Sequence, residues 1–155
     1  MVFEFGSYRM DVDVERTRRW YEAAPTVSQC CDCDGCVNYE RAADLFPESV
    51  KSFFAALGSD MKKPCEVYVN CANRDGTRLW YGGWCHLCGK LLSAQEEKWS
   101  VAEGEPFGPG GFRVWFREEC VCLPEDFPQS AFELELDADI PWVLEKENTY
   151  ERDRD

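Results

Sequence analysis

The residues of this chain with the most capacity for chemistry lie in one short segment, 30–36, which reads CCDCDGC. The segment holds four of the ten cysteines of the protein. Cys33 and Cys36 are separated by two residues, and with this spacing one tight turn can present two thiolates to a zinc ion. Cys31 supplies a third candidate thiolate, while Cys30 is left over. We therefore expect a zinc site whose first ligands are Cys33 and Cys36, with Cys31 as one of the candidates that could complete it.

A second pair, Cys85 and Cys88, can supply the remaining ligands in one of two ways. If the chain turns there, the two cysteines form a second metal-binding knuckle, and Gly89 relieves the backbone that follows. If the chain is a continuous strand, successive side chains point to opposite faces, so His86 and Cys88 share a face and Cys85 is buried. The sequence leaves both arrangements open, and Cys85, His86 and Cys88 are all candidate zinc ligands.

The same segment allows a redox alternative. Cys33 and Cys36 can act as the dithiol of an oxidoreductase, because the start of a helix lowers the pKa of a thiol. Asp32 and Asp34 oppose this, since neighbouring negative charges disfavour a thiolate. No buried strand precedes the pair, as the thioredoxin arrangement requires. A further alternative is a loop of free thiols without a function, although adjacent thiols of this kind are open to oxidation.

The inventory of catalytic groups is small. His86 is the only histidine, so any histidine-dependent triad or dyad has to use it. The sequence contains no nucleophile elbow, no phosphate-binding loop and no dinucleotide fingerprint. These observations favour a binding protein over an enzyme, and we assign no catalytic residue.

Length and charge set further bounds. With 155 residues, 45% of them hydrophobic, the chain is expected to form one domain over residues 1–145, followed by a charged, disordered tail over 146–155. The net charge of -13 repels nucleic acids and anionic membranes, so neither is an expected partner. A basic protein partner is an alternative function for the acidic C-terminal third. Because no export signal is apparent, we expect a cytoplasmic protein, in which ten cysteines indicate metal binding.

Hydrophobic spacing predicts helices from Glu15 to Ala24, directly after Cys36, and from Pro47 onward. Alternating patterns predict strands within residues 65–71, 77–92, 112–122 and 132–137. In the last of these, acidic residues alternate with apolar ones, which predicts a strand with a solvated acidic face. The expected fold is therefore α+β, with N-terminal helices packed on an antiparallel sheet of four to six strands.

Several segments between Asp11 and Leu144 are distinctive: VDVERTRRWYEAAP, CDCDGCVNYERA, FFAALG followed by KPCEVYV, YGGWCHLCG, LPEDFP and IPWVLE. On these segments the chain resembles a family of small uncharacterised bacterial proteins, mainly from Gram-positive organisms. The resemblance implies an α+β domain and no assigned activity. Cys33, Cys36 and His86 match the pattern of the family, whereas the position of Cys85 is more often aromatic. This departure favours the strand arrangement with His86 as a ligand.

The sequence hypothesis is thus a cytosolic binding or interaction domain with a structural zinc site built on Cys33 and Cys36. Its remaining ligands would come from Cys31, His86, Cys85 or Cys88. The alternatives are a dithiol oxidoreductase that uses Cys33 and Cys36, and an acidic protein that binds a basic partner.

Overall fold

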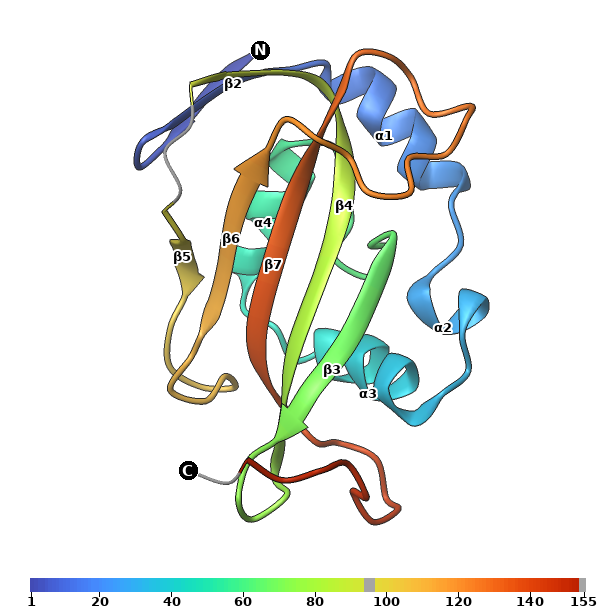
Figure 1. The fold of residues 1–155 in the computed structure, drawn as a ribbon, viewed down its shortest axis with the longest axis vertical. Coiled ribbons are helices and arrows are strands. Elements are labelled where there is room, and N and C mark those ends of the chain that lie inside the picture. The colour runs from blue at the N-terminus through green and yellow to red at the C-terminus, as the bar shows by residue number, and fades with distance from the viewer. Residues whose placement is uncertain (94–96, 154–155) are drawn as a thin grey trace.

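Strand β4 (Arg78–Ser93) is the longest element and forms the centre of the sheet (Figure 1). The structure is a computed structural model, and it describes residues 1–93 and 97–153. Strand β4 pairs on one edge with β7 (Ala131–Pro141). Its other edge is shared by β2 (Tyr8–Val12), near the end of β4, and by β3 (Glu66–Ala72). One strand can take two partners on one edge because it is 16 residues long.

The other elements extend this centre on both sides. The strand order is β1-β2-β4-β7-β6-β5, with β3 beside β4, and all pairings between these strands are antiparallel. The remaining strands are β1 (Val2–Phe5), β5 (Trp99–Ala102) and β6 (Phe112–Arg117). The helices are α1 (Val14–Ala23), α2 (Val27–Cys30), α3 (Asp34–Ala43) and α4 (Glu48–Ala56). The α+β class is therefore confirmed.

Two expectations about the sheet are wrong. Over the described residues the sheet has seven strands rather than four to six, and the helices do not begin the chain, because β1 and β2 precede them. Residues 2–12 form a hairpin that turns at Gly6, where φ is +56°. Met10 and Val12 on β2 are buried alternate residues, so this arm has an apolar face that joins the sheet beside β4.

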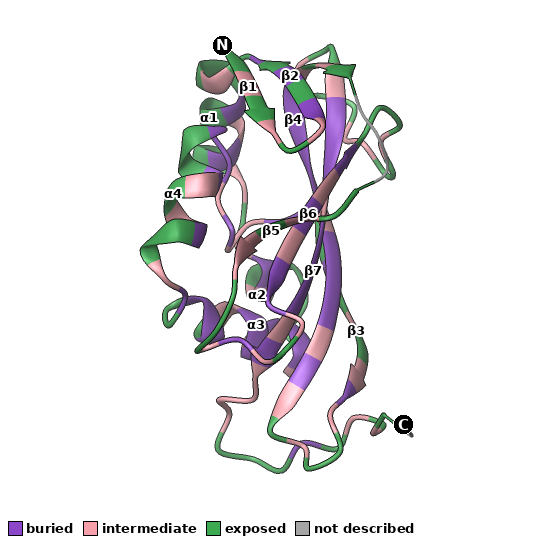
Figure 2. Ribbon diagram, turned by 90° about the vertical axis from the view of Figure 1, so that its left-hand side faces the viewer, coloured by how far each residue is buried: buried purple, intermediate pink, exposed green. Residues whose placement is uncertain are grey.

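Helices α1, α3 and α4 cover one face of the sheet (Figures 1 and 2). Helix α1 packs against β4, α3 against β3 and β7, and α4 against β5. Asp13 caps α1, since its side chain accepts a hydrogen bond from the backbone N–H of Arg16 at 3.1 Å. Large side chains such as Tyr39, Phe54 and Leu79 fill the space between helices and sheet. Within the described residues, no helix is both long and apolar enough to cross a membrane.

Strand β7 is buried on both faces, so the expected solvated acidic face is wrong. Glu133 is 0% exposed and Asp137 is 4% exposed. The reason is that other groups cover the acidic face of β7. Arg113 and Lys98 lie at Asp137, and the loop after β6 contacts Glu133 through Val121. Arg113 reaches Asp137 at 2.9 Å, and Arg78 reaches Asp139 at 3.2 Å. Much of the acidic charge on β7 is therefore paired inside the fold.

The charged C-terminal segment packs against β3, whereas the sequence predicted a disordered tail. The backbone N–H of Ala72 donates to the carbonyl of Glu151 at 2.8 Å, and the N–H of Asp153 donates to the carbonyl of Ala72 at 2.8 Å. Asn148 is 5% exposed. Figure 1 shows this segment in dark red below β3. The charged composition of this segment gave no indication of its backbone pairing with Ala72. Residues 154 and 155 of the predicted tail lie outside the described residues.

Candidate metal centre

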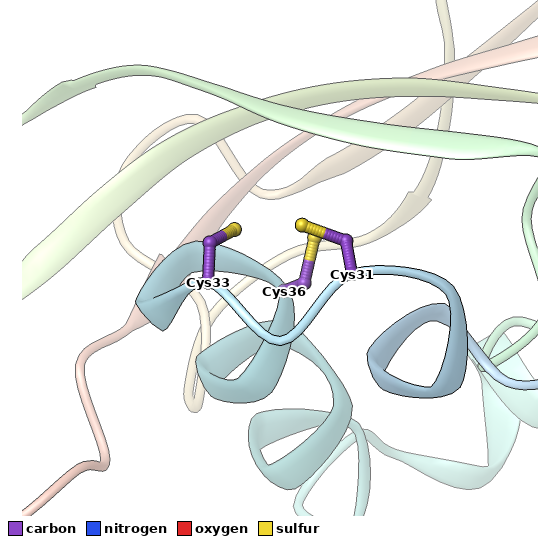
Figure 3. A group of neighbouring side chains, drawn as sticks. All are labelled: Cys31, Cys33 and Cys36. Carbon is purple, nitrogen blue, oxygen red and sulfur yellow. The ribbon is translucent and has the colours of Figure 1, made fainter.

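Three of the predicted ligands lie together where α2 is joined to α3 (Figure 3). The sulfur atoms of Cys31, Cys33 and Cys36 all lie within 4.8 Å of one another. We call this group the three-cysteine site. It could hold a metal ion, and the described part of the chain offers no fourth histidine, cysteine or acidic side chain at this distance from all three.

The local backbone explains why the three sulfurs meet. Cys31 (φ -147°, ψ 120°) and Cys33 (φ -64°, ψ 159°) are extended, and in extended chain residues two apart point to the same side. Cys33 is also the N-cap of α3, and Cys36 lies in the first turn of that helix, three residues later. Residues three apart are neighbours on a helix surface, so Cys36 returns to the side of Cys33. The spacing of two and then three residues therefore builds the site from local geometry.

Contacts between the two helices hold Cys31 against Cys36. The hydroxyl of Ser28, on α2, donates to the carboxylate of Glu40, on α3, at 2.6 Å. Val27 is buried, and its N–H donates to the carbonyl of Lys62 at 3.0 Å. Helix α2 is only four residues long, so these contacts, rather than its own backbone bonds, must fix its position.

Gly35 attaches the first turn of α3 to two distant parts of the chain. Its N–H donates to the hydroxyl oxygen of Tyr150 at 2.8 Å, and its carbonyl accepts from the hydroxyl of Tyr81 at 2.7 Å. A Cβ at this position would lie 2.8 Å from the Tyr150 oxygen and 2.9 Å from a methyl carbon of Val69. Glycine is therefore required here for close packing against the C-terminal segment and β3.

The thiols of the site differ in protonation. Partial burial acts to raise the pKa of Cys33, but hydrogen bonds from the backbone N–H of Cys36 and from the thiols of Cys31 and Cys36 lower it below its usual value. Burial raises the pKa of Cys36, and its hydrogen bonds to Cys33 and Cys31 raise it further. The site thus pairs one thiol that ionises readily with one that holds its proton.

These properties define what the site can do chemically. Three cysteine sulfurs form a soft donor set, which selects thiophilic ions over calcium or magnesium. Cys31 and Cys33 are exposed, while Cys36 is 6% exposed. An ion can therefore reach the site from solvent and rest against the buried sulfur of Cys36.

The second cysteine pair does not form a knuckle. Cys85 and Cys88 lie within β4, which runs without a turn from residue 78 to residue 93. Cys85 is 1% exposed and belongs to the hydrophobic core, where the hydroxyl of Ser59 lies 3.6 Å from its sulfur. Cys85 thus has the buried place that the strand arrangement predicts.

His86 is buried at 2% exposure, but it contacts the loop after β6 rather than the three-cysteine site. Its Nε2 lies 3.0 Å from the carbonyl oxygen of Val121 and 3.5 Å from a carboxylate oxygen of Glu133. A carbonyl only accepts hydrogen bonds, so Nε2 carries the proton. Burial lowers the pKa of His86, and this favours the neutral ring. Phe127 packs against the ring at 5.8 Å.

The carboxyl of Glu133 is a buried polar group that the sequence pattern did not reveal. One of its oxygens accepts the N–H of Val121 at 2.8 Å, and the other has no hydrogen-bond partner. Burial raises the pKa of Glu133 to about 7. The alternation of acidic and apolar residues in β7 pointed to solvent, and only the strand order shows that this residue is internal.

Cys88 is 2% exposed and lies near the N-terminal end of α1. Its N–H donates to the hydroxyl of Thr17 at 3.1 Å, and its thiol lies near the charges of Arg16 and Asp13. Among the described residues, Cys85, His86 and Cys88 are therefore not brought together with Cys31, Cys33 and Cys36.

Tyr150 and Gly35 support the three-cysteine site and were not identified from the sequence. The signal that could have identified Tyr150 is that it is the one aromatic residue in a charged segment, 146–155.

Comparisons of the chain with protein-family models, with curated proteins and with solved structures find no match. The resemblance to small bacterial proteins stays a prediction. The function therefore has to be inferred from the site itself.

Proposed function

We propose that this protein binds a thiophilic metal ion through Cys31, Cys33 and Cys36. One observation carries the proposal, namely that three cysteine sulfurs from two helix ends lie within 4.8 Å of one another. Local backbone geometry places the three thiols side by side, and a shared ion would give each of these sulfurs a bond. The ion would join α2 to α3 through Cys31 on one side and Cys33 and Cys36 on the other.

Zinc is the ion that the sequence suggested, and the donor set supports it in part. Zinc binds thiolates at ~2.3 Å and prefers four ligands in a tetrahedron. The three-cysteine site supplies three of them, and the fourth position would face solvent beside the exposed Cys31 and Cys33. A zinc site with one open position differs from a closed structural site of four protein ligands.

The proposed role is binding of the ion at the surface rather than formation of the core. The buried hydrophobic core is built from residues of β2, β3, β4, β6 and β7 and of the helices, and of the three proposed ligands only Cys36 contributes to it. The burial of these apolar side chains does not depend on ligands of the ion other than Cys36. We therefore expect the ion-free protein to fold, and the ion to add stability through its binding equilibrium.

Titration of the reduced protein with cobalt(II) and cadmium(II) tests the proposal. Thiolate coordination gives charge-transfer absorption in the near ultraviolet, and we expect it to saturate at one ion per chain. Cys31→Ser and Cys33→Ser remove exposed ligands, so these variants should fold and lose most of the signal. Cys65→Ser, at an exposed cysteine on another element, is the matched control and should keep the signal. Equal signals from all four proteins would refute the three-cysteine site.

A second candidate function is dithiol exchange, and the protonation of the site favours it. Cys33 is exposed with a lowered pKa, while Cys36 beside it is buried with a raised pKa. The thiolate of Cys33 would attack a substrate disulfide and release one thiol. Cys36 would then attack the mixed disulfide, so that the substrate is reduced to two thiols and the protein keeps a Cys33–Cys36 disulfide.

Reaction with oxidised glutathione distinguishes this function from ion binding. Exchange requires Cys33 and Cys36 only, whereas ion binding requires Cys31 as well. If Cys31→Ser leaves the exchange rate unchanged and Cys33→Ser abolishes it, the dithiol function is supported. If the wild-type protein exchanges no faster than Cys33→Ser, the dithiol function is excluded.

A further inference from the structure

We propose that the ligand of the three-cysteine site is a trivalent metalloid, namely arsenic(III) presented as arsenous acid, and that the site prefers it to zinc. This inference rests on the proposed function, because it names the class of ion that the same three sulfurs take. The observation behind it is the number of donors. Cys31, Cys33 and Cys36 meet, and within the described residues no fourth ligand joins them.

Coordination number separates the two kinds of ion. Zinc seeks four ligands, so a site of three sulfurs leaves one position to water. Arsenic(III) forms three bonds and carries a lone pair in the remaining direction. Figure 3 shows the three side chains above the start of α3, with their sulfurs on one side. A three-bonded atom held by these three sulfurs would have a complete set of ligands.

Charge favours the same choice. Three thiolates around a divalent ion leave a net charge of minus one, whereas three thiolates around arsenic(III) are neutral. The site lies next to Asp32 and Asp34 in a protein of net charge -13, so an added negative charge is unfavourable there. Arsenous acid is itself uncharged near neutral pH. Its binding therefore adds no charge to the acidic surroundings of the site.

The binding reaction balances without an oxidant or a reductant. Each sulfur forms one arsenic–sulfur bond as one arsenic–hydroxyl bond breaks, and the hydroxide leaves with the thiol proton as water. Three thiols and one arsenous acid thus give one trithiolate and three waters, with no change in oxidation state.

Exposure provides the route of entry. Cys31 and Cys33 are exposed and can react first, while Cys36 is 6% exposed and would close the third bond. Gly35 fixes the helix turn that carries Cys36, through Tyr150 and Tyr81. The third sulfur is thus already positioned when the first two bonds form, which increases the strength of binding by all three over any two.

Native mass spectrometry of the full reduced chain with arsenous acid tests this inference. We expect an adduct heavier by one arsenic atom and lighter by three hydrogen atoms. In Cys31→Ser and Cys33→Ser, affinity for arsenous acid should fall by about 100-fold or more, since only two sulfurs remain. Cys65→Ser should bind as the wild type does. Competition should show that zinc in equal amount does not displace arsenic from the wild-type chain.

The pH dependence gives an independent measure. Because each arsenic–sulfur bond that forms from a thiol releases water and no proton, the affinity for arsenous acid should not rise between about pH 6 and pH 8. Zinc binding displaces thiol protons, so its affinity should rise with pH over the same range. If zinc binds one per chain through the same cysteines and arsenous acid forms no three-bond adduct, this inference fails while the proposed function stands. If neither binds, both fail.

Discussion

The backbone N–H of Gly35 donates a hydrogen bond to the hydroxyl oxygen of Tyr150 at 2.8 Å, across 115 positions of the chain. This contact joins the C-terminal segment to the first turn of α3, directly beside the three-cysteine site. Lys146 of the same segment reaches the carboxylate of Asp34 at 3.0 Å. The segment that the sequence marked as a free tail is therefore a support for the candidate metal centre.

Removal of this contact should weaken both the fold and the site. Tyr150→Phe leaves the buried N–H of Gly35 without its acceptor, so we expect the free energy of unfolding to fall by about 1 kcal/mol. Urea denaturation measures this change. Tyr68→Phe, at a side chain that is 46% exposed, is the matched control and should change stability by less than about 0.5 kcal/mol. Equal effects would mean that the Gly35 contact contributes nothing.

The thiols of Cys33 and Cys65 should differ in their rates of alkylation. Hydrogen bonds from neighbouring groups lower the pKa of Cys33, against the effect of its partial burial, whereas partial desolvation of the Cys65 sulfur raises the pKa of that thiol. Both residues are exposed, so access alone does not separate them. At about pH 7, iodoacetamide should alkylate Cys33 before Cys65, because the thiolate is the reactive form. Peptide mass spectrometry at short reaction times gives the order. Prior reaction of Cys65 would contradict the protonation of the site described above.

Glu133 should give stability a distinct pH dependence. Its pKa rises from 4.5 to about 7 on folding, because burial disfavours the carboxylate. The folded state then holds a proton that the unfolded state releases, so this contribution to stability is fully present below pH 4.5 and is lost as the pH rises to about 7. His86 acts in the opposite direction, since its lowered pKa costs stability as the pH falls below 6.5.

Glu133→Gln removes the contribution of Glu133 to the pH dependence of stability and leaves the contribution of His86. Relative to the wild type, the variant should gain stability as the pH rises from about 5 to 7 and show no further relative change above that. The groups that face Glu133 are His86, the backbone of Val121, and Glu135 and Arg117. Urea denaturation at several pH values measures the difference. Glu125→Gln, at an exposed residue of the covering loop, is the control, and a difference of the same shape there would contradict the assignment to Glu133.

Gly89 should be intolerant of a side chain. Its φ is +143°, and a Cβ would lie 2.0 Å from the carbonyl oxygen of Asp11 on the neighbouring strand. Gly89→Ala should therefore separate β2 from β4 and cost about 3 kcal/mol. Gly104→Ala is the matched control, because its φ is also positive at +78° but nothing lies within 4 Å of the added Cβ. It should cost about 1 kcal/mol. Equal losses would show that backbone strain alone is responsible.

The sequence by itself determined the features that depend on neighbouring residues. The cap at Asp13, the helix after Cys36 and the long strand through Cys85 follow from local spacing. The spacing of the three-cysteine site is of this kind, because two extended residues and one helical turn place Cys31, Cys33 and Cys36 on one side. The contact of Ser28 with Glu40 then holds α2 against α3.

Only the tertiary structure decided which strands lie at the centre and which residues cover them. His86 turned toward Val121 and Glu133 because β4 pairs with β7 and the loop after β6 covers that face. Acidic residues of β7 are internal because Arg113 and Lys98 cover Asp137 and the loop after β6 covers Glu133. The C-terminal segment is fixed because Tyr150 and Ala72 find partners far away in sequence. These contacts of the C-terminal segment join positions 79 to 115 residues apart, and local spacing carries no information about them.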